Sequence, residues 1–219
     1  MELAKYIDHT FLNPAGDGNA VRKLCREAKK YGFCSVCVNP AEVPLAVKLL
    51  KKSAVKVCTV IGFPLGQNST EIKVAEALDM LEKGADELDF VINVRLLKYN
   101  PEACFDELAA CVGACRSAVP KAELKLIIEC CYLTDDEKIL ACSLAKRSGF
   151  DFVKTSTGFG PSGATEADVK LMRNVVGKKM GVKAAGGIRT REDAEKMIKA
   201  GASRLGCSAS VAIVSKYSQ

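Results

Sequence analysis

Short apolar segments rich in strand-forming residues alternate along the chain with longer segments whose apolar residues recur at helical spacing. Val74, Ala77, Leu78 and Leu81 follow the i, i+3, i+4, i+7 pattern of a helix with one buried face. Residues 194–198 repeat part of this pattern. The intervening apolar segments predict eight strands, at residues 6–10, 33–38, 56–61, 87–91, 124–128, 151–154, 182–184 and 204–207.

Capping residues mark the ends of several predicted helices. A hydroxyl or amide residue followed three positions later by an acidic residue is typical of a helix start. Such pairs are Asn68 with Glu71, Thr134 with Glu137, Thr165 with Asp168, and Thr190 with Asp193. Glycines that end helices just before a strand are Gly32, Gly84, Gly149 and Gly201.

The regular alternation of eight strands with helices predicts an α/β fold, a (β/α)8 TIM barrel rather than a doubly wound sheet. The sequence has no linker, short repeat or low-complexity tract, so we expect a single domain over residues 1–219 with a short N-terminal helical segment. The chemistry of such barrels takes place at the C-terminal ends of the strands. Polar residues gather there in the predicted elements: Asp8, Thr10, Asn39, Asp89, Asn93, Glu129, Lys154, Lys183 and Ser208.

Two lysines have the same local sequence context. Lys154 ends an apolar strand and precedes Thr155-Ser156-Thr157-Gly158, and Lys183 ends the next strand before Gly186-Gly187. Burial lowers the pKa of a lysine, and a second cation nearby lowers it further, which makes the free amine available as a Schiff-base nucleophile. A single lysine at a strand end more commonly reaches solvent. Two at the ends of successive strands favour one shared cavity.

Carboxylates and one histidine accompany these lysines. Asp89 has apolar neighbours, so it needs a cationic partner, and such a pairing is compatible with both a structural role and proton transfer. Asp8 is a weaker candidate because it can also cap the following loop. His9 points to the opposite side of its strand from Asp8 and Thr10, and we expect it to be structural.

The last two predicted loops suggest an anion site. Gly186-Gly187 follows the seventh strand, and Ser208 is expected to open the final helix. Phosphate sites of barrels often use these loops and a helix N-terminus. The alternative is a tight turn at the glycines and a simple N-cap at Ser208; together the two features favour phosphate.

Composition excludes several classes of protein. The net charge of +6 is scattered over helix faces and there is no tryptophan, so nucleic acid is not an expected partner. One histidine excludes multi-histidine metal sites. No apolar run reaches membrane-spanning length and no secretory segment is present, which favours a cytoplasmic location with no membrane partner. The 11 cysteines, Cys111 and Cys115 among them, are expected to be reduced core residues, and Cys34-x-x-Cys37 is not expected to form a redox or zinc site.

Taken together, these motifs resemble those of the 2-deoxyribose-5-phosphate aldolase family of class I aldolases. The matching stretches run through nearly the whole chain and are residues 7–10, 37–40, 61–66, 87–89, 153–158 and 183–190. The resemblance implies a (β/α)8 barrel that reversibly cleaves 2-deoxy-D-ribose 5-phosphate to acetaldehyde and D-glyceraldehyde 3-phosphate in deoxyribose phosphate catabolism. It implies no metal or other cofactor, a small phosphorylated sugar as the substrate, and a homo-oligomer, either a dimer or a tetramer.

The resemblance also implies roles for individual residues. Lys154 corresponds to the Schiff-base lysine, Lys183 to the neighbour that lowers its pKa, and Asp89 to the carboxylate of the proton relay. The residues implied in substrate binding are Asp8, Thr10, Gly158, Gly186, Gly187 and Ser208.

The sequence differs from the family at two places, and three alternative functions remain open. The sequence Cys207-Ser208-Ala209 lacks one hydroxyl found in the family, and Tyr217 lies near, not at, the C-terminus, so it has no assigned role. Another Schiff-base lyase on the same barrel, a decarboxylase or dehydratase, is the main rival. A non-catalytic phosphate-ligand-binding barrel ranks lower, because burying two lysines and a carboxylate without chemical use is unfavourable. A metal-dependent aldolase is disfavoured by the single histidine.

Overall fold

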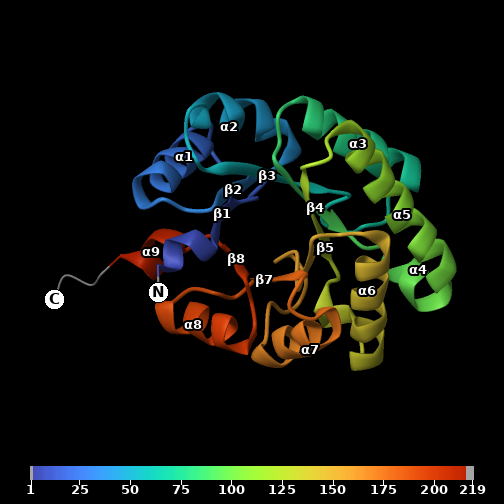
Figure 1. Ribbon diagram of the computed structural model, residues 1–219. Coiled ribbons are helices and arrows are strands. Elements are labelled where there is room, and N and C mark those ends of the chain that lie inside the picture. The colour runs from blue at the N-terminus through green and yellow to red at the C-terminus, as the bar shows by residue number, and fades with distance from the viewer. Residues whose placement is uncertain (1, 216–219) are drawn as a thin grey trace.

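A computed structural model of the protein describes residues 2–215. Its eight strands are all parallel and close into one barrel in sequence order (Figure 1). The strands are β1 (Ile7–Phe11), β2 (Ser35–Val38), β3 (Lys56–Ile61), β4 (Glu87–Val91), β5 (Glu123–Ile127), β6 (Phe152–Lys154), β7 (Gly181–Ala185) and β8 (Arg204–Cys207). The predicted (β/α)8 TIM barrel is confirmed.

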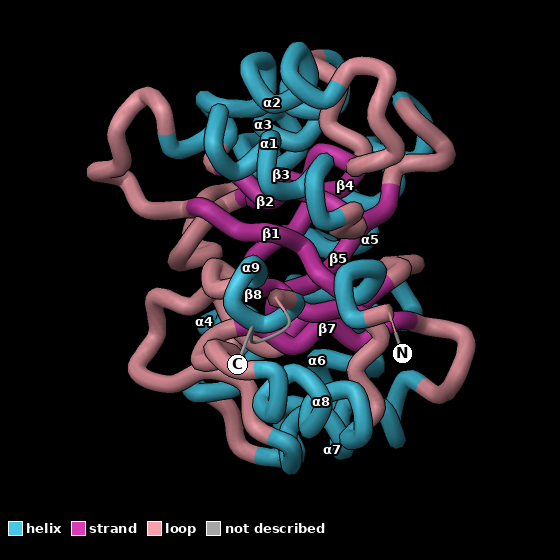
Figure 2. The backbone as a smooth tube through the Cα atoms, turned by 90° about the vertical axis from the view of Figure 1, so that its left-hand side faces the viewer, coloured by secondary structure: helices cyan, strands magenta, loops and turns pink. Residues whose placement is uncertain are grey.

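Helices surround the barrel, and in the side view they lie on both sides of the central strands (Figure 2). They are α1 (Ala20–Tyr31), α2 (Val43–Leu50), α3 (Thr70–Glu82), α4 (Val94–Tyr99), α5 (Pro101–Ala118), α6 (Asp135–Ser148), α7 (Glu166–Val176), α8 (Arg191–Ala200) and α9 (Ser210–Val214). Short 3₁₀ helices occur at η1 (Leu3–Tyr6), η2 (Pro40–Glu42) and η3 (Cys130–Tyr132), and η1 is the predicted N-terminal helical segment. No helix within residues 2–215 is long and apolar enough to cross a membrane.

Most of the predicted capping residues occupy the ends of their helices. Thr134 and Thr190 form complete capping boxes, and the Thr165 side chain accepts a hydrogen bond from the Asp168 amide. Asn68 was the wrong choice for α3, because Ser69 occupies the N-cap position and neither residue's side chain caps the helix. The glycines Gly32, Gly149 and Gly201 end their helices in the left-handed conformation.

Strand alternation divides the side chains between two environments. Outward-facing apolar residues such as Leu88, Leu124 and Leu205 are fully buried beneath the helices. His9 also points outward, where its Nδ1 lies 2.9 Å from Ser210 Oγ on α9 and its Nε2 lies 2.9 Å from Glu27 Oε2 on α1. It is therefore a structural residue, as expected. Burial lowers the pKa of His9 and outweighs the opposing effect of Glu27.

Candidate active site

A cavity of about 410 Å³ opens at the C-terminal ends of the strands. Its wall contains the loops that follow β1, β6, β7 and β8, so segments far apart in the sequence meet there. Six predicted site residues line it: Thr10, Lys154, Gly158, Gly186, Gly187 and Ser208. The convergence expected at this end of the barrel is present.

Lys154 is the amine at the bottom of this cavity. It is the last residue of β6, and the side chain is only 3% exposed although it lines the cavity. Its Nζ donates to Asp89 Oδ2 at 2.7 Å. A nearly desolvated amine on the wall of a cavity is placed to attack an electrophile that enters it.

Lys183 lies directly beside Lys154, because the two residues are register partners on β6 and β7. Its Nζ donates to the same Asp89 oxygen at 2.8 Å and also lies 2.5 Å from Asp8 Oδ2. The contact with Asp8 is an ion pair without hydrogen-bond geometry. Gly206 on β8 leaves room for this lysine, since a Cβ there would lie 3.2 Å from Lys183 Cε.

Next to Lys154 the barrel interior contains a closed ring of alternating charges, which includes Lys183, in place of the usual apolar layers. We call it the charge ring; its members, in order, are Arg204, Asp8, Lys183, Asp89, Lys125 and Glu87. Successive partners lie 2.9, 2.5, 2.8, 3.1, 2.6 and 3.0 Å apart, from the Arg204–Asp8 contact round to the Glu87–Arg204 contact. Every cation in the ring thus has an anion on each side.

The ring favours the charged forms of Asp8, Asp89, Lys183, Lys125 and Arg204. Burial alone raises the pKa of Asp89, but Lys125, Lys154 and Lys183 outweigh it and hold that pKa well below the usual value. Burial likewise lowers the pKa of Lys183, yet Asp8 and Asp89 raise it well above normal. Burial also lowers the pKa values of Lys125 and Arg204, but the neighbouring carboxylates outweigh it and raise both. Lys183 therefore stays a cation beside Lys154.

Three glycines and Arg189 form another part of the cavity wall. Gly158, Gly186 and Gly187 all have positive φ, at 89°, 85° and 81°, which lets the backbone line the cavity without side chains. Arg189 follows and adds an exposed guanidinium group to the same wall. Consecutive backbone N–H groups with a cation beside them are typical of phosphate sites.

Ser208 differs from its predicted role. It does not open the last helix, because α9 begins at Ser210 and its N-cap position is Ala209. Ser208 instead lines the cavity as part of the β8–α9 loop. The simple N-cap alternative is therefore wrong.

Not all predicted residues face the cavity. Asp8, Asp89 and Lys183 are completely buried beneath it and are not part of its wall. Asp8 is in the charge ring, so its expected contact with substrate stays a prediction. Tyr217 lies outside the described residues.

Sequence reasoning missed several buried charges. Lys125, Glu87 and Arg204 lie in buried strands in which apolar residues predominate, and only their barrel-facing position brings them together. Glu129 was noticed only as a strand end. Its backbone adopts the left-handed conformation with φ of 54°, and its carboxylate accepts from the Thr157 amide at 3.1 Å and from the Thr157 hydroxyl. Glu129 thereby holds the loop that follows Lys154.

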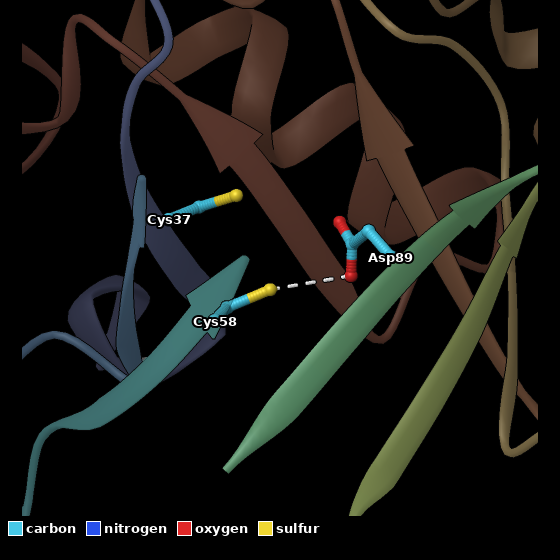
Figure 3. Close-up of side chains that lie close together, drawn as sticks. All are labelled: Cys37, Cys58 and Asp89. Atoms are coloured by element: carbon cyan, nitrogen blue, oxygen red, sulfur yellow. Dashed lines mark hydrogen bonds between the residues drawn. The ribbon is translucent and has the colours of Figure 1, made fainter. Parts of the chain in front are cut away.

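Two thiols reach toward Asp89 from neighbouring strands, as Figure 3 shows. Cys58 Sγ lies 3.3 Å from Asp89 Oδ1, and the Cys37, Cys58 and Asp89 ligand atoms all lie within 4.8 Å of one another. This spacing suits a metal ion, but Lys125, Lys154 and Lys183 already surround the carboxylate. The ammonium groups of Lys125 and Lys183 disfavour a cation there, and the expected absence of a metal stays a prediction.

The pair Cys37 and Cys58 differs from the other cysteines. The hydrogen bond with Cys58 lowers the pKa of Cys37, against the effect of burial. Burial raises the pKa of Cys58 well above normal. All cysteines in the chain are free thiols, and Cys34 and Cys37 form no pair.

Comparisons with known proteins agree with this geometry. Residues 2–213 match the model of the DeoC/LacD family of aldolases. A deoxyribose-phosphate aldolase of Clostridium perfringens is 57% identical over 97% of this chain and 94% of its own length. One of Thermococcus gammatolerans is 56% identical over 98% and 96%. The solved structure of a tetrameric deoxyribose phosphate aldolase from Aeropyrum pernix is 39% identical, has a TM-score of 0.90, and covers 97% of this chain and 89% of that one.

Proposed function

Because this chain belongs to the DeoC/LacD family of aldolases, we propose that it is a deoxyribose-phosphate aldolase. It reversibly cleaves 2-deoxy-D-ribose 5-phosphate to acetaldehyde and D-glyceraldehyde 3-phosphate through a lysine Schiff base, in the catabolism of deoxyribose phosphate. The observation that carries this proposal is a desolvated lysine, Lys154, in the same cavity as a glycine-lined anion site.

The proposed chemistry begins at Lys154. Its neutral amine attacks the aldehyde carbon of the open-chain sugar, and loss of water gives a protonated imine. A base removes the proton of the C3 hydroxyl, the C2–C3 bond breaks, and the electrons of that bond move into the imine. Glyceraldehyde 3-phosphate leaves, and the remaining enamine is protonated at C2 and hydrolysed to acetaldehyde and the free amine.

Proton transfer in this scheme is assigned to Asp89 and Lys183. Asp89 Oδ2 contacts the amines of both Lys154 and Lys183. A proton that leaves one amine therefore has a short path through this carboxylate to the other amine. Positioned acid–base groups typically contribute 10²–10⁴-fold to rate. No metal is required, because the protonated imine itself withdraws the electrons of the broken bond.

The phosphate end of the substrate is assigned to the glycine-lined part of the cavity wall. Backbone N–H groups near Gly158, Gly186 and Gly187 would bind its oxygens, with Ser208 and Arg189 beside them. Thr10, on β1, also lines the cavity and would contact a sugar hydroxyl. Asp8 would act on the substrate only through Lys183.

Assembly and location are finer parts of the proposal. The relative from Aeropyrum pernix is described as tetrameric, which supports a homo-oligomer, and light scattering after size-exclusion chromatography tests it. Eleven free thiols support a reducing compartment such as the cytoplasm. The single-domain organisation over residues 1–219 also stays a prediction, supported by one closed barrel.

A substrate assay tests the proposed function. The purified protein should release glyceraldehyde 3-phosphate from 2-deoxyribose 5-phosphate, measured by a coupled NADH assay, without added metal and in the presence of EDTA. A Schiff-base decarboxylase would instead release carbon dioxide from a keto acid, and a dehydratase would lose water without carbon–carbon cleavage. A non-catalytic barrel would bind the sugar phosphate in calorimetry without turnover. Absence of glyceraldehyde 3-phosphate with intact fold would reject the aldolase assignment.

A further inference from the structure

The charge ring is electrically complete without Lys154. It holds three cations, Arg204, Lys183 and Lys125, and three carboxylates, Asp8, Asp89 and Glu87. Lys154 is attached to it from outside, and its only ion-pair partner among residues 2–215 is an Asp89 oxygen that Lys183 already contacts. A protonated Lys154 would therefore be a fourth buried cation facing three anions.

We propose that Lys125 and Glu87 are positioning residues that set the protonation of Lys154 by fixing the charge balance of the ring. With the ring complete, the surplus positive charge is most easily removed by releasing the proton of Lys154. This inference rests on the proposed function only in taking Lys154 as the reacting amine.

Lys125 has the contacts that this role needs. Its Nζ lies 3.1 Å from Asp89 Oδ1, while Lys154 and Lys183 both contact Oδ2. Lys125 thus fixes the orientation of the carboxylate as well as its charge. Glu87 lies on the far side of Lys125, at 2.6 Å, and lines no part of the cavity. Both residues can act on Lys154 only through Asp89 and the local field.

A removed charge in this ring is not replaced by water. Lys125 is fully buried and Glu87 is 4% exposed, so the medium around them is of low dielectric constant and their fields reach Lys154 with little screening. Losing Lys125 leaves two cations facing three carboxylates, and Lys154 would then keep its proton as the third cation. Losing Glu87 has the opposite effect, because three cations then face two carboxylates.

Other ionisable groups face the same region and are left unchanged by the test. They are the Cys37 thiol on β2, the Cys58 thiol on β3 and Glu123 on β5. Glu123 lies 3.0 Å from Arg204 Nη2 and 3.5 Å from Lys125 Nζ, but its side chain is 30% exposed, so water screens it. Because these groups are common to all variants, differences between variants report the ring itself.

The test measures the protonation of Lys154 directly. The protein is incubated with acetaldehyde and sodium cyanoborohydride over a range of pH, and the labelled fraction of Lys154 is measured by peptide mass mapping. The variants are Lys125→Met, Glu87→Gln and the double variant, each checked by circular dichroism. We expect the pH midpoint of labelling to rise by about one unit in Lys125→Met, from one unit charge at several ångströms. It should fall in Glu87→Gln and return toward the parent value in the double variant, where two cations face two carboxylates.

The outcomes separate the two proposals. If Lys154 of the parent protein is never labelled, the nucleophile of the proposed function is wrong. If it is labelled but the midpoint is the same in all variants, only the ring inference is overturned. If Lys125→Met does not fold, the direction of the shift in Glu87→Gln decides. A purely structural role would lower labelling in both single variants without opposite shifts, and the double variant would then be worse rather than restored.

Discussion

Lys154 and Lys183 contact the same carboxylate oxygen, Asp89 Oδ2, at 2.7 and 2.8 Å. Their remaining surroundings differ. Lys183 has a second carboxylate, Asp8, at 2.5 Å, whereas Lys154 has no second carboxylate among the described residues and lines the cavity. Asp8 thus gives Lys183 a carboxylate that Lys154 lacks, and together with Asp89 it raises the pKa of Lys183 well above normal. This asymmetry supports Lys154 as the proposed nucleophile.

The first prediction follows from that asymmetry. Incubation with 2-deoxyribose 5-phosphate and sodium borohydride should add one reduced adduct per chain, located on the peptide that contains Lys154. Lys154→Met should lose both the adduct and turnover by several orders of magnitude, because no other amine lines the bottom of the described cavity. An adduct on Lys183 would show that the assignment is reversed.

The second prediction concerns Lys183. Replacing it by methionine removes a cation that contacts the same oxygen as Lys154, so Lys154 should hold its proton to higher pH. We expect the acid limb of the pH–rate profile of Lys183→Met to shift to higher pH by about one unit or more, with lower turnover at pH 7. Profiles of kcat/KM for parent and variant measure this shift. A parent-like profile would leave Lys183 without an electrostatic role.

The third prediction tests the relay. Asp89→Asn should lower kcat by about 10²-fold or more, because an amide neither accepts a proton nor balances the Lys125 and Lys183 cations that contact it. Breaking a buried ion pair on one side also costs about 3–5 kcal/mol of stability. Urea unfolding at pH 7 is therefore measured beside turnover. A folded variant with nearly the parent kcat would remove Asp89 from the mechanism.

The same carboxylate gives a fourth prediction, on pH. The folded-state pKa of Asp89 is held well below its usual 3.8, so the unfolded chain binds its proton first as pH falls. Its stabilising contribution is complete above the unfolded pKa and is lost as pH falls toward the folded value. The free energy of unfolding of the parent should thus decline below about pH 4, and Asp89→Asn should decline less steeply. Equal slopes in the two proteins would contradict the ion network as drawn.

The sequence predicted local features well and long-range pairing poorly. Strands 56–61, 87–91 and 204–207 have the predicted bounds; the second and third begin three residues after Gly84 and Gly201, and the first follows a turn. Lys154 and Lys183 were found because each precedes glycines. Alternation along β5 gives Lys125 a face but does not say that this face points into the barrel. Its partner Glu87 lies 38 positions earlier, and no local pattern connects the two.

Glu129 and Arg189 were missed for different reasons. A left-handed backbone is expected at glycine or asparagine, so nothing in the local sequence predicts that Glu129 adopts it. Arg189 lies in the stretch 183–190 that matches the family, but it was not predicted as a site residue. Only the folded β7–α8 loop shows that it lines the same cavity as Lys154.

The last prediction concerns the phosphate and uses Arg189 with a matched control. Arg191 lies two positions later, is also exposed, and pairs with Glu195 at 2.9 Å without lining the cavity. Arg189→Met should raise KM for 2-deoxyribose 5-phosphate by about tenfold, since a charge-assisted hydrogen bond of about 1.5–3 kcal/mol is weakened by solvent at this exposed position. Arg191→Met should leave KM unchanged.

Unphosphorylated 2-deoxyribose separates anion binding from general damage to the site. It lacks the group that Arg189 would contact, so both arginine variants should cleave it at the parent rate. A rise in KM that is confined to the phosphorylated sugar and to Arg189→Met would place the anion beside the Gly186-Gly187 turn. Equal effects on both sugars would mean that Arg189 supports the loop rather than the ligand. Because the backbone N–H groups remain in every variant, a residual preference for the phosphorylated sugar in Arg189→Met is expected, and its size measures what the backbone contributes.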